Sequence, residues 1–250
     1  GGVPEKGEKS AITYLLTNRI NIKIVYSLQR SLNPLKDFKA GNEIRKIIKE
    51  YQPDIVHTHG SKSGFLGRWI ASRENVPVII HTFHGHVFRS YFSKIVTRLY
   101  ISLERYIAKK TDLIIVLSID QKSEICNDYK IAAVDKTRII PLSIDAKTLD
   151  DSEGHRMEFR EKYKLNNQIA IGLIGRLVPV KNVDLFIEAL SILRNSVDGW
   201  KAFIIGDGPE VNRLKGKVVQ LKLNDNITFT SWIHPPIKAI SGLDIVALSS

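Results

Sequence analysis

Histidines concentrate in one short part of this sequence. Five of the seven lie between residues 57 and 86, within "DIVHTHGSKSG" and "HTFHGHVF". Histidine can ligate a metal, move protons near neutral pH, or serve as a hydrogen-bonded polar residue in a strand. No cysteine or carboxylate stands beside the histidines within either motif at ligand spacing, so we expect no metal site. Acid–base and structural roles both stay open at this point.

The positions of three histidines suggest different roles. His57 and His81 lie within apolar runs that are typical of buried strands, and we expect them to be structural. His84 follows the run 76–82 and precedes a glycine. Parallel strands bring such exits together at one edge of a sheet, where open α/β folds bind ligands. We therefore single out His84 as a candidate catalytic residue.

A neighbouring strand exit carries three polar side chains. His59, Ser61 and Lys62 follow the apolar run 54–59. A hydroxyl and a cation at a strand exit suit an anionic ligand. We predict that these side chains contact an anionic acceptor.

A second cluster lies about ninety residues later, in "IGLIGRLVPVKNVDLF" (171–186). Gly175 ends a strand pattern and allows close backbone approach, and Arg176 and Lys181 then precede a helix that begins near Asn182. The first N–H groups of a helix and two cations together suit a diphosphate. The alternative is an ordinary surface loop that happens to carry two cations.

The next strand exit reads "IIGDGPE" (204–210). Gly206 and Gly208 bracket Asp207, and Pro209 suits the first position of a helix. Taken alone, this is a helix-capping turn. It contains neither the G-x-G-x-x-G pattern of dinucleotide sites nor the G-K-[ST] of a phosphate-binding P-loop.

Strand and helix patterns alternate along the chain, which positions these exits. The runs 21–28, 54–59, 76–82, 112–118 and 137–142 predict strands, separated by helices over 37–51, 63–74, 93–110 and 119–129. After a polar linker at 143–155, strands over 168–175, 200–206, 226–230 and 242–250 alternate with helices over 182–195 and 209–222. Short apolar strands alternating with helices indicate α/β units with parallel sheets. We expect two domains, 1–146 and 147–250.

Composition and charge narrow the class of protein. A single cysteine, Cys126, favours a reducing cytoplasmic compartment, and no apolar run approaches the roughly 20 residues that span a bilayer. The net charge is +11, and residues 1–150 hold 24 Lys and Arg against 15 Asp and Glu. This excess suggests an anionic partner such as acidic lipid, nucleic acid or a phosphorylated substrate. Solvated lysines on helix faces are the alternative, and no nucleic-acid-binding signature is present.

The combination of these motifs resembles glycosyltransferase family four of the GT-B class. The resemblance is carried by Arg176 with Lys181, by "GDGPE", and by "PDIVHTHGSKSGFLGR" (53–68), "VPVIIHTFHGHVF" (76–88) and "RIIPLSID" (138–145). It implies an α/β fold with two Rossmann-like domains, the first binding the acceptor and the second the nucleotide-sugar donor. It also implies transfer with retention of configuration and without a metal, because protein cations stabilise the departing diphosphate.

The resemblance assigns roles to named residues. It implies donor binding by Gly175, Arg176, Lys181, Gly206, Asp207 and Gly208. His84 matches the family's histidine near the transferred sugar, where it could orient a sugar hydroxyl or bring its backbone carbonyl to the reacting centre. We expect no cofactor beyond the nucleotide sugar, an acceptor that is a cell-surface glycan or a lipid-linked molecule, and no nucleic acid. A cytoplasmic enzyme at the inner face of the plasma membrane, on an anionic surface, fits these expectations.

The resemblance also places family elements outside this sequence. The first strand, helix and second strand would precede it, and a glutamate pair that contacts the donor would follow Ser250. We therefore expect both domains to be incomplete and the chain by itself to be inactive. Two other functions remain open from the sequence: a GT-B sugar-nucleotide epimerase, and a basic nucleic-acid-binding α/β module.

Overall fold

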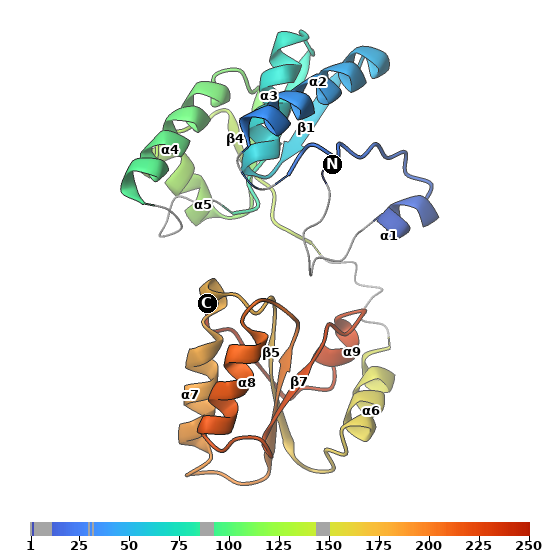
Figure 1. The fold of residues 1–250 in the computed structure, drawn as a ribbon, viewed down its shortest axis with the longest axis vertical. Helices are drawn as coiled ribbons and strands as arrows, with labels where there is room; N and C mark the ends of the chain where they lie inside the picture. The colour runs from blue at the N-terminus through green and yellow to red at the C-terminus, as the bar shows by residue number, and fades with distance from the viewer. Residues whose placement is uncertain (1, 3–11, 30, 32, 86–92, 144–150) are drawn as a thin grey trace. The chain divides into compact units, whose positions relative to one another are not determined.

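The structure, a computed structural model, describes residues 2, 12–29, 31, 33–85, 93–143 and 151–250 (Figure 1). The chain divides into two compact units, Gly1–Ser143 and Ile144–Ser250, called here the N-terminal and C-terminal units. The boundary predicted between residues 146 and 147 lies outside the described residues. The predicted linker 143–155 was partly wrong, because its last residues begin helix α6 (Ser152–Lys162).

The N-terminal unit is built on one parallel sheet. Its strands stand in the order β1-β2-β3-β4, and all three described pairings are parallel. The elements are α1 (Ile12–Thr17), α2 (Pro34–Tyr51), β1 (Ile55–His59), α3 (Ser61–Arg73), β2 (Val78–Thr82), α4 (Lys94–Ala108), β3 (Leu113–Val116), α5 (Ile119–Ser123), a π-helical turn (Glu124–Asp128) and β4 (Thr137–Ile139).

Apolar helix faces cover this sheet in two groups. Ile48 of α2 and Ile70 of α3 pack with Ile79 of β2. On β3, Ile114 joins Ala108 of α4 and other buried side chains in a second cluster. Burial of these faces against the strands is the main term that favours the unit over the unfolded chain.

One predicted strand is absent. Residues 21–28 form no strand in the described structure, although the run is apolar. Val25 and Ser27 are nevertheless buried, and Ser27 Oγ donates to Glu43 Oε1 at 2.7 Å. A strand requires a hydrogen-bonded neighbour, and the described sheet pairs β1 only with β2. The segment therefore packs against α2 as irregular backbone.

The C-terminal unit is also built on one parallel sheet. Its parallel strands stand in the order β7-β6-β5-β8. Helices α7 and α8 lie on one face, and α6 and α9 lie on the other (Figure 1). The elements after α6 are β5 (Ile169–Ile174), a 3₁₀ turn (Pro179–Lys181), α7 (Val183–Leu193), β6 (Trp200–Ile205), α8 (Val211–Gln220), β7 (Ile227–Thr230), α9 (Ile237–Ile240) and β8 (Ile245–Ala247).

The two parallel sheets confirm the predicted α/β class. Helices α1, α6 and α9 were not predicted, because two are very short and α6 is strongly polar. Phe159 is the buried residue of α6, where it packs with Phe203 of β6. A single apolar anchor in eleven residues gives no clear helical period to read from sequence.

Candidate functional site: the strand exits of each unit

Two strand exits lie side by side in the C-terminal unit. The strands are parallel, so the loops after β5 and β6 meet at the same edge of the sheet. Gly175 N–H donates to Ile205 O at 3.0 Å, and Leu177 N–H donates to Asp207 O at 3.0 Å. Glu210 N–H returns a bond to Leu177 O at 3.2 Å. The loops therefore form one continuous hydrogen-bonded platform.

Glycine makes this close approach possible. Gly206 has a φ of +141°, and a Cβ placed there would collide with the carbonyl oxygen of Gly175. A Cβ on Gly208 would collide with the carbonyl oxygen of Leu177. Both substitutions would separate the loops, since a backbone carbonyl cannot rotate away as a side chain can. The "GDG" motif thus has a packing role that its sequence alone did not reveal.

Arg176 and Lys181 lie on this platform. Arg176 is exposed and directly follows Gly175. The chain then forms the 3₁₀ turn, and Asn182 adopts a left-handed conformation as the N-cap of α7. Lys181 is half-buried, with its Cε 3.9 Å from where a Gly175 Cβ would stand. The structure thus brings Gly175, Arg176 and Lys181 together at the start of α7.

The third exit of this sheet also reaches the platform. Ser249, just after β8, donates its hydroxyl to Lys181 O at 2.8 Å. Asp207 is exposed, and its carboxylate accepts the Gly208 N–H at 2.7 Å. Helix α8 begins at Val211, so the expectation that Pro209 opens the helix was wrong, and Pro209 lies in the preceding turn.

An ion-pair network joins the two helices that follow these exits. Asp184 in the first turn of α7 binds Arg213 at 2.6 Å and Lys217 at 2.8 Å, both from α8. Lys217 also binds Glu188 at 2.6 Å. Hydrogen bonds from Arg213 and Lys217 lower the pKa of Asp184 well below its usual range. The sequence signal was the four-residue spacing of both the acidic and the basic pair, which places each pair on one helix face.

In the N-terminal unit, three histidines lie along β1 and after β2: His57 in the middle of β1, His59 at its end, and His84 beyond β2. The expectation of a buried position for His57 was wrong, because its side chain is exposed on β1. His59 Nδ1 lies 2.8 Å from His84 Nε2, within hydrogen-bond distance. The ring centroids of His57 and His59 are 4.3 Å apart, and His57 Nε2 lies 2.8 Å from Thr82 Oγ1. The structure therefore brings His59 and His84 together, as expected for neighbouring exits.

Proton affinity is reduced in this group. Although His57 is exposed, its partial desolvation, followed by the nearby His84, lowers its pKa. Burial, then His57 and His84, lowers the pKa of His59. The lowered pKa values favour the neutral form of both rings at pH 7, and a neutral imidazole offers one donor and one acceptor nitrogen.

His81 is buried, as predicted, with 1% of its surface exposed. Its Nδ1 lies 2.9 Å from Thr58 Oγ1, and a Cβ on Gly64 would collide with its ring. Burial, followed by repulsion from Arg68, lowers the pKa of His81 to about 2. Its role is structural, and the charged form would be strongly disfavoured in this position.

The other acceptor-side residues occupy the start of α3. Ser61 is its first residue, after Gly60. The Lys62 ammonium donates to Gln29 O at 2.8 Å and Ser31 O at 2.6 Å, and it pairs with Asp37. These contacts tie the segment before α2 to α3. A contact of Lys62 with an acceptor stays a prediction, with the ammonium already held by three oxygen atoms.

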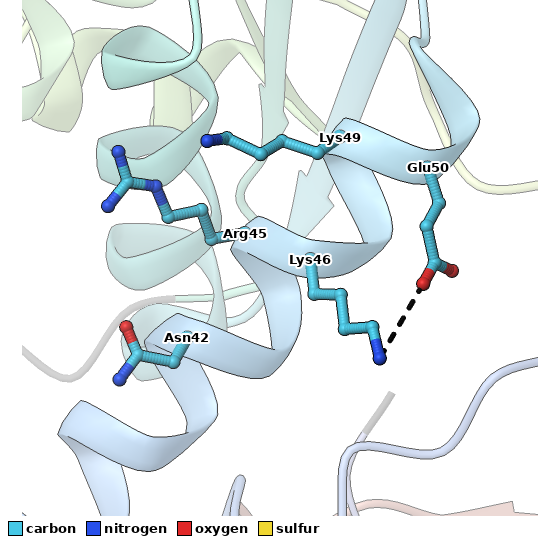
Figure 2. A pocket seen from close by; sticks show the side chains of 5 residues that line it. All are labelled: Asn42, Arg45, Lys46, Lys49 and Glu50. Carbon is cyan, nitrogen blue, oxygen red and sulfur yellow. Dashed lines mark ion pairs between the residues drawn. The ribbon is translucent and has the colours of Figure 1, made fainter.

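A shallow hollow lies along α2 in the same unit. Figure 2 shows its lining side chains: Asn42, Arg45, Lys46, Lys49 and Glu50. Glu50 pairs with Lys23 at 2.7 Å and with Lys46 at 3.8 Å, and Glu74 pairs with Arg45 and Lys49. The cations of this hollow thus already have carboxylate partners, which makes it a weak candidate for an anion site.

Two kinds of feature are absent from the described residues. No group of three or more His, Cys, Asp or Glu side chains among them could hold a metal ion. None of the described helices combines the length and apolar character needed to cross a bilayer.

Known proteins match both units. The family model "Glycosyltransferase Family 4" matches residues 4–148, and "Glycosyl transferases group 1" matches residues 155–250. The chain is 31% identical over 248 residues to the Escherichia coli UDP-Gal:alpha-D-GlcNAc-diphosphoundecaprenol alpha-1,3-galactosyltransferase, covering 97% of this chain and 64% of that protein. It is 29% identical over 214 residues to alpha-monoglucosyldiacylglycerol synthase of Streptococcus pneumoniae, covering 81% of this chain and 47% of that protein.

Solved structures share the fold. Anabaena HepE in complex with UDP and glucose superposes with a TM-score of 0.79 at 19% identity, covering 96% of this chain and 64% of HepE. A glycosyltransferase from Rickettsia africae gives 0.70 at 22% identity, covering 97% of this chain and 63% of that chain. This chain therefore spans just under two thirds of the length of these relatives. The matched models and the two α/β units together show that the chain belongs to glycosyltransferase family 4, of the GT-B class.

Proposed function

We propose that this protein transfers a sugar from a nucleotide-diphosphate sugar to a lipid-linked acceptor, with retention of anomeric configuration. The observation that carries the proposal is the platform of the C-terminal unit. There Gly175, Arg176 and Lys181 meet the start of α7 and the glycines of the next exit. This arrangement suits a diphosphate, which gains negative charge as the sugar leaves.

The chemistry assigned to the donor site follows from charge. Cleaving the bond between sugar and diphosphate leaves an additional negative charge on the departing oxygen. Arg176 and Lys181 can stabilise that charge, and the first N–H groups of α7 add the positive end of the helix dipole. Two protein cations supply the charge that a divalent metal supplies in other phosphate sites, so we propose a metal-free reaction. Asp207 and the two glycines keep the loop close enough for these contacts.

The acceptor class is supported by named relatives. One is named for an undecaprenol diphosphate acceptor and another for a diacylglycerol lipid. In the proposed reaction, His84 faces the transferred sugar, and His59 and Ser61 lie on the acceptor side. No observation in the two units favours an epimerase, and the family assignment argues against a nucleic-acid-binding module.

Nucleotide binding tests the donor site directly. UDP and GDP should bind this chain measurably in calorimetry, and inorganic pyrophosphate should compete with them. Lys181→Ala should weaken binding by roughly tenfold or more, since a charge-assisted hydrogen bond contributes about 1.5–3 kcal/mol. Lys215→Ala is the matched control, an exposed lysine in the middle of α8. Equal binding by both variants, or no binding of either nucleotide to the unmodified chain, would remove the proposed donor site.

A membrane surface is proposed for α4. Its exposed apolar side chains are Ile95, Leu99, Leu103 and Tyr106, which fall on one side of the helix. Lys94, Arg98 and Arg105 are also exposed, whereas the one acidic residue of the helix, Glu104, is buried. Arg68 pairs with Glu104 at 2.7 Å. The outer surface of α4 thus carries apolar and cationic groups without anions, which suits an anionic bilayer better than the paired cations of α2.

Vesicle binding is the corresponding prediction. The chain should co-sediment with vesicles containing an anionic phospholipid and should be released as salt rises, because each basic residue near such a surface contributes about 1 kcal/mol. Ile95→Glu combined with Leu99→Glu should abolish this binding. Ile192→Glu, an exposed apolar position on α7, is the control and should bind normally. Equal binding of the unmodified chain to neutral vesicles would show that the charge is only a solvated surface.

A further inference from the structure

The hydrogen bond between His59 and His84 links two strand exits. It joins Nδ1 of His59 to Nε2 of His84 over 2.8 Å. Two neutral imidazoles can form such a bond only if one donates and the other accepts. The bond therefore couples the tautomers of the two rings and restrains their orientation.

Either ring could donate this hydrogen bond, and the tautomer preference of histidine favours donation by His84. Free neutral histidine prefers the tautomer with its proton on Nε2. If His84 donates from Nε2 to Nδ1 of His59, both rings can hold this preferred tautomer. The reverse arrangement requires His59 to carry its proton on Nδ1. The first arrangement leaves Nδ1 of His84 as a lone-pair acceptor, and no described residue forms a hydrogen bond to that atom.

His59 is itself held from two sides. Its carbonyl accepts a hydrogen bond from Ser63 Oγ at 2.6 Å. Its ring lies against that of His57, whose Nε2 is 2.8 Å from Thr82 Oγ1. Ser63 thus holds the backbone of His59 and His57 restrains its ring, so that His59 can orient its partner, as second-layer hydrogen bonds orient functional histidines elsewhere.

We propose that His59 is a positioning residue: its Nδ1 accepts the hydrogen bond that Nε2–H of His84 donates, and this keeps Nδ1 of His84 free to accept a hydrogen bond from a hydroxyl group. The hydroxyl belongs to the transferred sugar or to the acceptor, and this part rests on the function proposed above. His59 then acts through His84 and does not need to touch the substrate. His59 and His84 would then act as one hydrogen-bonded pair contributed by two strand exits.

Nuclear magnetic resonance tests the proton arrangement in this chain without any substrate. With ¹⁵N-labelled histidine, His84 should show a protonated Nε2 and a bare Nδ1. A scalar coupling across the hydrogen bond should connect Nε2 of His84 with Nδ1 of His59. His59→Ala should abolish the coupling and return His84 to the tautomer mixture of free histidine. His59→Asn should preserve the His84 tautomer, because Asn Oδ1 stands near the position of histidine Nδ1. His234→Ala, in the other unit, should change nothing at His84.

Kinetics separate this inference from the proposed function. In the full-length enzyme, His59→Ala should lower kcat about tenfold, a part of the effect of losing an acid–base group outright. His59→Asn should recover most of that loss, and UDP affinity should be unchanged in both variants. A proton on Nδ1 of His84, or a His59→Ala enzyme with normal kcat, would overturn the inference. Absence of UDP binding in the unmodified protein would instead overturn the proposed donor site and leave the resonance result standing.

Discussion

Arg176→Ala and Lys181→Ala are each expected to lower sugar transfer by the full-length enzyme by roughly 10²–10³, the cost of losing one donor to a developing negative charge. The loss should fall mainly on kcat, because the additional charge on the diphosphate appears as the sugar leaves. A steady-state assay with a nucleotide sugar and a lipid-linked acceptor measures this.

Folding must be unaffected for this result to be interpretable. Arg176 is exposed and Lys181 is half-buried, so neither variant should leave a cavity in the core. Circular dichroism and the thermal midpoint should therefore match those of the unmodified enzyme. Lys215→Ala again serves as the matched control and should retain normal activity. If both site variants retain activity within a few-fold of the unmodified enzyme, the donor-phosphate assignment is wrong.

The donor platform shows what sequence can and cannot predict. Alternating apolar runs and helical patterns predicted the parallel strands, and parallel strands place their exits at one edge. This was sufficient to group Gly175, Arg176 and Lys181 beforehand. The contact of Gly206 with the Gly175 carbonyl could not be predicted, because it depends on how closely two loops approach. The left-handed Asn182 that starts α7 was also beyond a pattern of apolar spacing.

For the histidine cluster, too, the sequence predicted the position of the residues but not their detailed contacts. Its position at two neighbouring exits followed from the strand pattern, and the pairing of His59 with His84 is consistent with it. The tautomers depend on a distance between two side chains, which no periodicity contains. The strand predicted over residues 21–28 was wrong for a related reason. Its apolar residues are buried in part, but burial alone does not make a strand without a neighbour to share hydrogen bonds.

Acidification is expected to destabilise the N-terminal unit before the C-terminal unit. His81 has a pKa of about 2 in the folded chain, mainly because it is buried, against an ordinary value of 6.5. The unfolded chain therefore binds a proton at His81 below pH 6.5 that the folded chain does not. Stability from this group is fully present above pH 6.5 and is lost as pH falls toward 2. Between pH 7 and pH 5 the loss is about 2 kcal/mol for one such histidine.

The C-terminal unit contains a group with a different pH window. Burial alone would raise the pKa of Asp244. Hydrogen bonds from the Ala170 N–H, Arg156 and Arg160 outweigh burial and lower this pKa to about 2. Its ordinary value is 3.8, so its contribution is fully present above that pH and is lost only below it. Amide hydrogen exchange, corrected for its intrinsic pH dependence, should show weaker protection of β2 and β3 at pH 5 while β5 and β6 are unchanged.

His81→Asn isolates the group responsible, since an asparagine amide can still donate to Thr58 Oγ1 but does not titrate. Glu104 acts in the opposite direction, because burial raises its pKa and its protonation at low pH favours the folded chain. The variant is expected to be less stable than the parent at pH 7 and to lose much less stability on going to pH 5. His57 and His59 remain in the variant and account for the slope that persists, since their pKa values are also lowered. An equal loss of protection in the two units, or an unchanged pH slope in His81→Asn, would show that His81 does not control the acid stability of the N-terminal unit.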